Sequence, residues 1–352
     1  MRVNSKPKIV ISWHGLPFYA ARLIRAGIQS LDEPVAVIAT FPRQNRDDLE
    51  EELGQSVYWL DSAKRYSWID LGLEIPEIYF QSGWLSTAFK SLGYEVYQNR
   101  GSVICLSDNL WKGGLKQWAG ALLFQLKYRA YFTAFWVPGE AGTRYCQRLG
   151  ISKHDIYCGM YGADPSVFLS GMPIQDRKKQ FLFVGQLIER KGIELLINAF
   201  DIFSKNFPDW ELLVIGDGPL YSKLDAKLDN NVKVEKFQPA RHIAARMRES
   251  RFLILPSLQE HWGLVVHEAS LSGCGLIASE SVGAAPDLVT LNNGYVFRSN
   301  SVSSLHNAMV KAATMNDFQL NNILAENSTV SAKFGPHAWA KSFSQIIHDI
   351  RS

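Results

Sequence analysis

Two glutamates, Glu260 and Glu268, lie on either side of a Trp-Gly pair and a short apolar run in the segment EHWGLVVHE. An apolar strand, FLILP, ends shortly before them, and a helix can start near Gly263 and stop at Gly273. The first carboxylate then lies on a loop and the second about a turn and a half inside the helix. Both can therefore face the same ligand.

The start of this predicted helix is itself a binding element. The backbone amides of Gly263, Leu264 and Val265 have no partner inside a helix, and together they carry roughly half a positive charge. A phosphate can bind there, and Gly263 lets it approach closely. With a carboxylate on each side to accept hydrogen bonds from hydroxyl groups, the pattern suits a sugar or ribose diphosphate. The alternative for Glu268 is a solvated helix face, but its apolar neighbours indicate a mostly buried helix, where an unpaired carboxylate is costly.

The elements that must position these residues form a regular series in the second half of the chain. Short apolar runs alternate there with helical stretches: FLFVG, ELLVIGDGP, NVKVEKF, FLILPS, GLIASES and GYVF. This alternation predicts a doubly wound parallel sheet, which binds ligands at the carboxyl ends of its strands. Gly185, Gly216 and Gly218 follow two of those ends.

The first half repeats the pattern less regularly, with the predicted strands KIVISW, PVAVIAT, EIYF, SVICLS and AFWVPG. The fold class is therefore α/β, with two Rossmann-like, doubly wound domains facing across a cleft. A stretch rich in Gly, Pro and Ser at 160–180 is the expected join. We place the domains at 1–165 and 166–335, followed by a helix at 336–352 with Trp339 and Phe343 on its apolar face.

Composition and charge exclude several classes of protein. Apolar residues make up 47% of the 352 residues and charged residues 20%, as in a folded globular protein. Residues 1–170 carry 18 basic and 16 acidic residues and the remainder 19 and 18, so the net charge of +3 is spread as +2 and +1. No basic stripe suggests nucleic acid as a partner. Four scattered cysteines and no signal-peptide core favour the cytoplasm.

The segment at 115–137, LKQWAGALLFQLKYRAYFTAFWV, has two interpretations. It is dense in Leu and aromatic residues, but Lys116, Lys127 and Arg129 interrupt it, so it cannot span a bilayer cleanly. One possibility is an interfacial helix that makes a peripheral contact with the inner membrane face. The other, which we expect, is a buried helix that runs into a strand.

Four ordered motifs resemble a known family. The spacing E-x7-E in EHWGLVVHE, with FVGQLIERKGIELLINAF upstream, IGDGP in the middle and GAAPDLV…NNGYVF downstream, is similar to the retaining family 4 glycosyltransferases, the glycosyl transferases group 1. The match covers roughly residues 181–297, and VPGEAGTRYCQRLGI and YGADPSVF match more weakly. The resemblance implies a GT-B fold, in which the C-terminal helix packs back on the N-terminal, acceptor-binding domain and the C-terminal domain binds a nucleotide sugar.

The resemblance also implies roles for individual residues. Lys191, with Arg190 beside it, matches the cation that holds the donor diphosphate; otherwise RKG is an exposed helix start with two solvated cations. Glu260 matches the glutamate that contacts the donor sugar, and Glu268 the one that holds the ribose hydroxyls. The glycines expected to line the nucleotide pocket are Gly185, Gly216 and Gly218.

This chain also departs from the family pattern. Gln186 stands where the family usually has arginine, so donor binding is expected to depend more on Lys191. The first strand ends in His14 with a single glycine after it, and Asp108 stands where the family commonly has a histidine. Asp108 and His14 are the candidate polar contacts near the reacting bond, although a lone histidine is more often structural.

The sequence therefore predicts a retaining, metal-independent hexosyltransferase. It would move a sugar from a UDP- or GDP-sugar to a polysaccharide, lipopolysaccharide, glycolipid or other glycan, with no cofactor beyond the donor. No DxD motif suggests a metal-bound donor, and GDGPLY lacks the third glycine of a dinucleotide fingerprint. The alternatives are a catalytically silent GT-B sugar-binding protein and a nicotinamide-dependent oxidoreductase.

Overall fold

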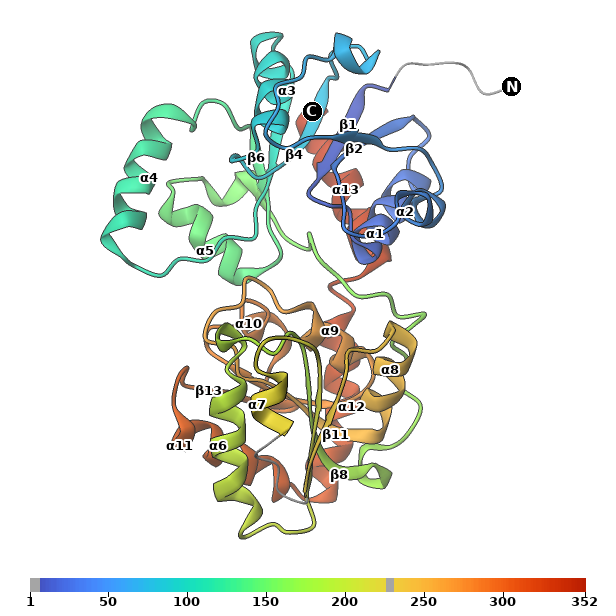
Figure 1. Cartoon of the computed structure of the whole chain (residues 1–352). Helices are drawn as coiled ribbons and strands as arrows, with labels where there is room; N and C mark the ends of the chain where they lie inside the picture. The colour runs from blue at the N-terminus through green and yellow to red at the C-terminus, as the bar shows by residue number, and fades with distance from the viewer. Residues whose placement is uncertain (1–6, 226–230) are drawn as a thin grey trace. The chain divides into compact units, whose positions relative to one another are not determined.

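The computed structural model describes residues 7–225 and 231–352, which divide into two compact units, each built on its own parallel sheet (Figure 1). Unit 1 comprises the described residues up to Gly162 together with Phe334–Ser352, and unit 2 is Ala163–Lys333. Every strand pair in both sheets is parallel. The predicted α/β class with two doubly wound domains is confirmed.

Unit 1 has a seven-stranded sheet in the order β3-β2-β1-β4-β5-β6-β7. Its strands are β1 (Ile9–Trp13), β2 (Val35–Thr40), β3 (Tyr58–Leu60), β4 (Ile78–Ser82), β5 (Ser102–Leu106), β6 (Ala134–Trp136) and β7 (Ile156–Tyr157). Every residue of β1 and β2 is buried, as expected where helices cover both faces of a sheet. The helices are α1 (Phe18–Gln29), α2 (Arg46–Leu53), α3 (Thr87–Gln98), α4 (Leu115–Lys127), α5 (Glu140–Arg148) and α13 (Pro336–Arg351).

The C-terminal helix α13 packs in the core of unit 1, beside α1 (Figure 1). Trp339 and Phe343 are fully buried there, and the ring of Trp339 lies against that of Trp136, with centroids 4.6 Å apart and planes tilted by 39°. The two helices approach closely because α1 has Gly27 at the contact, where a Cβ would lie 2.2 Å from the indole of Trp339. A glycine on one helix thus makes room for a tryptophan on the other.

Unit 2 has a six-stranded sheet in the order β10-β9-β8-β11-β12-β13. Its strands are β8 (Lys178–Val184), β9 (Glu211–Ile215), β10 (Val232–Glu235), β11 (Ser250–Leu255), β12 (Gly275–Ser279) and β13 (Gly294–Phe297). Its helices are α6 (Ile193–Ser204), α7 (Tyr221–Asp225), α8 (Ala240–Glu249), α9 (Leu264–Leu271), α10 (Ala285–Leu288), α11 (Val302–Ala313) and α12 (Asp317–Ser331). The central strands are apolar and buried, which is why they could be recognised from the sequence.

The burial expected for the aromatic segment at 115–137 is wrong for its helical part. Helix α4 buries only Ala121 and Phe124, while most of its large apolar side chains are exposed. The rest of the segment contains the short, buried strand β6. Among the described residues, no helix is both long enough and apolar enough to cross a membrane.

Candidate functional site

Unit 2 contains a cavity of about 610 Å³ at the carboxyl ends of its central strands. Residues just after β8, β9 and β11 line it, together with the start of α9. From the predicted site, the lining includes Gly185, Arg190, Lys191, Glu260, Gly263, Leu264, Val265 and Glu268. Gly185 and Glu268, 83 positions apart in the sequence, thus line one cavity, as expected at the carboxyl ends of the strands in a doubly wound sheet.

Lys191 and Glu260 form an ion pair in the wall of the cavity. The ammonium of Lys191 contacts Oε2 of Glu260, and the two side chains are only 12% and 13% exposed. The same oxygen accepts a hydrogen bond from the hydroxyl of Ser257 at 3.2 Å and lies 3.5 Å from Nη1 of Arg190. Arg190 also donates to the carbonyl of Gln259 at 2.7 Å. Two cations and one carboxylate are therefore held within reach of a single ligand.

The backbone that carries these cations is fixed by a glycine. Lys191 ends a single 3₁₀ turn, Glu189–Lys191, and Gly192 follows in a left-handed conformation with φ of 71°. A Cβ on Gly192 would lie 2.2 Å from the carbonyl oxygen of Pro256, at the end of β11. The amide of Leu258 donates to the carbonyl of Arg190 at 2.9 Å, which joins the two loops. The RKG segment is therefore tied to the loop of Glu260.

Helix α9 starts directly at the cavity. Gly263, with φ of 91°, precedes its first residue, and a Cβ there would lie 3.0–3.1 Å from side chains of Leu255, Glu260 and Val282. Leu264 and Val265, the first two helical residues, line the cavity, so their backbone amides and the positive end of the helix dipole are directed at a ligand position. This arrangement is suited to an anion.

Glu268 lines the cavity from within α9 and is half-buried. Burial raises the pKa of this carboxyl to about 7. The adjacent residue, His267, anchors the helix: its Nδ1 accepts from the amide of Ala163 at 2.9 Å, and its Nε2 lies 3.3 Å from the carbonyl of Ser331. Because burial lowers the pKa of His267 to about 4, the ring is neutral at physiological pH and donates through Nε2.

The predicted glycines Gly216 and Gly218, unlike the other residues predicted to bind the donor, do not line the cavity. Asp217, which lies between them, does line it. A Cβ on Gly216 would lie 1.9 Å from the carbonyl oxygen of Gly185, so this glycine lets the two strand-end loops pass closely. Asp217 accepts a hydrogen bond from the amide of Phe237 at 3.1 Å.

The sequence reasoning missed several lining residues: Phe168, Val184, Asp217, Phe237, Ala240 and Ile243. Asp217 could have been found, because it follows a strand end between two glycines. Phe237 is 59% exposed and lies on a loop with no motif, so its spacing carries no signal. Gln186, identified as a departure from the family pattern, also lines the cavity.

Asp108 and His14 lie in unit 1, after the strands β5 and β1. Asp108 accepts a hydrogen bond from the hydroxyl of Tyr161 at 3.0 Å. Burial lowers the pKa of His14, while the negative charge of Asp108 partly opposes this shift. The two groups therefore interact electrostatically. The backbone after His14 has positive φ at Gly15 and at Leu16, and strain of this kind often marks a functional loop.

Residues 171–330 match the family model described as glycosyl transferases group 1. This range contains every residue that lines the cavity of unit 2 except Phe168. It does not contain His14 or Asp108, so the family match leaves the polar groups of unit 1 as predictions.

Comparisons with known proteins agree with that match. An uncharacterized glycosyltransferase of Methanocaldococcus jannaschii is 28% identical over 165 residues, which are 46% of this chain and 44% of the relative. The amylovoran biosynthesis glycosyltransferase AmsK of Erwinia amylovora is 24% identical over 214 residues, 56% of this chain and 52% of the relative. The alignments thus span about half the length of these relatives.

The fold is also found among solved structures. Anabaena HepE, in a crystal structure with UDP and glucose, superposes with a TM-score of 0.72 over 97% of this chain and 99% of its own. Only 14% of the residues are identical, so this similarity shows the fold, which is GT-B.

Proposed function

Because the chain belongs, through residues 171–330, to the glycosyl transferases group 1 and has the GT-B fold, we propose that it is a retaining hexosyltransferase that uses a nucleotide-diphosphate sugar. The observation that carries the proposal is the cavity of unit 2, where Arg190, Lys191, Glu260, Glu268 and the start of α9 converge. Cations and helix amides bind diphosphate, and carboxylates bind hydroxyl groups.

Each group then has a chemical task. Lys191 and Arg190, with the amides of Leu264 and Val265, stabilise the negative charge that develops on the departing diphosphate. Glu260, held by Lys191 and Ser257, is directed at the donor sugar. The two cations are protein groups, so this scheme needs no metal ion to neutralise the leaving group.

The nucleoside would occupy the remainder of the cavity. Glu268 would accept hydrogen bonds from the ribose hydroxyls, and Phe237 offers an exposed ring on which a base can stack. HepE was crystallised with UDP and glucose, which makes UDP the first nucleotide to test and GDP the second.

The reaction would be a front-face displacement. The bond from the anomeric carbon to the diphosphate oxygen breaks, the acceptor oxygen bonds to the same face, and the leaving phosphate takes the acceptor proton. No side chain has to act as general base. A polysaccharide or glycolipid acceptor is our preference, with AmsK, a relative named for amylovoran biosynthesis, as the support. Asp108 and His14 are proposed contacts of that acceptor, and a cytoplasmic location stays a prediction.

The proposal is tested with a panel of UDP-, GDP- and ADP-sugars and NADH. We expect one nucleotide class to raise the melting temperature and its sugar to be slowly hydrolysed. The Glu260→Gln variant should lose at least about a hundredfold in turnover while it keeps its fold, whereas Glu194→Gln, an exposed carboxylate on α6, should not change it. Stabilisation by NADH alone would favour the oxidoreductase, and nucleotide-sugar binding without turnover would favour the silent sugar-binding protein.

A further inference from the structure

Helix α4 presents an apolar face that the fold leaves uncovered. Leu115, Trp118, Leu122 and Leu126, spaced three, four and four residues apart, form one stripe on the helix. They are 88%, 50%, 64% and 79% exposed, and the neighbouring Leu123 is 56% exposed. A helix of the core would bury such a stripe; here it faces outward.

The opposite face of α4 holds the helix on unit 1. Ala121 and Phe124 are buried in a core cluster, and the Phe124 ring contacts Phe132 and Phe135 at 6.4 and 5.9 Å. Trp118, on the exposed stripe, makes an edge-to-face contact with Trp111, and the two ring centroids are 5.0 Å apart. Figure 1 shows α4 at the outside of unit 1, beside α5. The stripe is therefore presented by an anchored helix.

Every charged residue in the stretch of sequence that contains α4 is basic. No aspartate or glutamate occurs between Asp108 and Glu140, although 34 acidic residues in 352, about one in ten, would place roughly three there on average. Four cations occupy the same stretch: Lys112, Lys116, Lys127 and Arg129. Two acids outside this stretch are paired with arginines, Asp155 with Arg129 at 3.3 Å and Glu140 with Arg144 at 3.9 Å.

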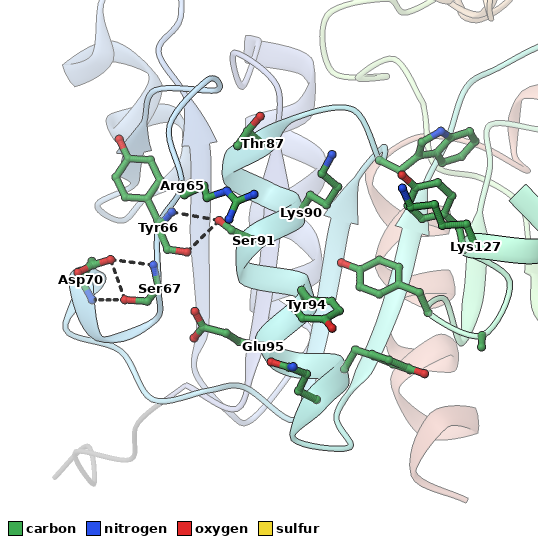
Figure 2. Close-up of a pocket in the computed structure, with 16 residues that line it drawn as sticks. Arg65, Tyr66, Ser67, Asp70, Thr87, Lys90, Ser91, Tyr94, Glu95 and Lys127 are labelled. Carbon is green, nitrogen blue, oxygen red and sulfur yellow. Dashed lines mark hydrogen bonds between the residues drawn. The ribbon is translucent and has the colours of Figure 1, made fainter. Parts of the chain in front are cut away.

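A pocket of mixed charge adjoins the C-terminal end of α4. Its volume is about 870 Å³, and its charged lining residues are three cations, Arg65, Lys90 and Lys127, and two acids, Asp70 and Glu95 (Figure 2). Figure 2 shows Lys90 on α3, with Lys127 toward the right of the view and Asp70 and Glu95 toward the left. Lys127 therefore joins the cations of this pocket to those of α4.

We propose that α4 lies on an anionic lipid bilayer, with its leucines and Trp118 in the interface and its lysines at the headgroups. An amphipathic helix with an apolar stripe, flanking lysines and no acid fits that environment. A second copy of this chain is a poorer partner, because its matching surface would carry the same positive charge. Binding of α4 to a bilayer does not require the proposed sugar transfer, so the two can be tested independently.

The test is co-sedimentation with vesicles of phosphatidylglycerol and phosphatidylcholine, compared with vesicles of phosphatidylcholine alone. We expect binding to the anionic vesicles only, weakened by high salt. The double substitution Leu122→Ser and Leu126→Ser should lower partitioning at least about tenfold, because each leucine contributes buried apolar area in the interface. Lys116→Glu with Lys127→Glu should have a similar effect on anionic vesicles.

The matched control is Leu169→Ser with Leu291→Ser, two leucines of unit 2 that are 58% and 87% exposed. This control should bind vesicles like the wild type, and all variants should keep the nucleotide-dependent melting shift. Wild-type protein that stays in the supernatant at low salt would overturn the proposal, as would binding unchanged by both α4 variants. A wild-type dimer that the leucine variant makes monomeric, without vesicle binding, would assign the stripe to self-association instead.

Discussion

At the scale of single residues, the cavity of unit 2 keeps its two carboxylates in different electrostatic surroundings. Glu260 has a lysine and a serine hydroxyl as partners, whereas burial raises the pKa of Glu268 to about 7. A carboxyl that costs stability when ionised, and that lines a cavity, is typical of a binding site rather than of a packing position. Its cost can be measured.

We predict that Glu268→Gln stabilises the fold above neutral pH and weakens nucleotide binding. Since the pKa of Glu268 in the folded state lies above the ordinary value of 4.5, the folded state holds the proton more tightly, and stability falls as pH rises from about 4.5 to 7. The variant removes that loss, so its melting temperature should exceed the wild type's at pH 8 and approach it near pH 4.5. Equal melting temperatures at pH 8 would contradict this.

The same residue should give nucleotide binding a pH dependence. If the ionised carboxylate accepts the ribose hydroxyls, the affinity for UDP should decrease as pH falls below about 7 in the wild type and less so in Glu268→Gln. Isothermal titration between pH 6 and 8 measures this directly. Glu194→Gln, an exposed carboxylate outside the cavity, provides the control.

The Lys191–Glu260 ion pair predicts non-additive effects. Lys191→Met leaves a carboxylate at a 13% exposed position without its ammonium, so it should destabilise the fold by about 1–3 kcal/mol. Adding Glu260→Gln should recover part of that loss, because it removes the charge that has lost its lysine partner, but should not restore sugar transfer. Urea unfolding and turnover of the singles and the double measure the coupling; additive stability effects would show that the pair is not energetically linked.

At the scale of elements, the position of the cations depends on how closely two loops approach. Gly192→Ala would strain a left-handed residue and place a methyl group 2.2 Å from the carbonyl of Pro256. We expect a melting temperature several degrees lower and weaker binding of diphosphate, since Lys191 is the preceding residue. Gly171→Ala, where a Cβ would meet nothing within 4 Å, should leave both unchanged. Similar melting temperatures for both variants would refute the close contact.

At the scale of the whole molecule, the sequence predicted the long buried elements and failed at short or uncovered ones. Eleven predicted strands are present, but β3 and β7, with three and two residues, are too short to show a pattern. The segment at 115–137 was recognised as dense in Leu and aromatic residues, but composition does not say whether protein covers those side chains, so the predicted burial was wrong for α4.

In the candidate site, too, some residues could be predicted from the sequence and others could not. Residues at strand ends and helix starts could be predicted, because the topology fixes where these ends meet, and eight of them line the cavity. Phe237 could not be predicted as a lining residue, because it lies on a loop whose path depends on tertiary packing. The sequence also gave no sign that Lys191 and Glu260 form a pair, since 68 residues separate them along the chain.

The chain leaves unit 1 after Gly162 and returns to it at Phe334. Within unit 1, Trp339 links the segment before the first crossing to the helix after the second. Its indole Nε1 donates to the carbonyl of Met160 at 3.0 Å, just before the chain leaves, and α13 begins where the chain has returned. Gly162 and Gly335 lie so close that a Cβ on the first would be 2.1 Å from the amide nitrogen of the second. Packing of α13 should therefore contribute much of the stability of unit 1.

We predict that Trp339→Ala destabilises the protein by about 3–5 kcal/mol, because it empties a fully buried site against Trp136, Phe343 and Gly27. Combining it with Gly27→Ala should cost less than the sum of the two changes, since the added methyl group would enter the space that the indole leaves. Urea unfolding measures both effects, with Phe318→Ala, a 74% exposed ring on α12, as the control. A loss as small as that of Phe318→Ala would mean that α13 contributes little to the stability of unit 1.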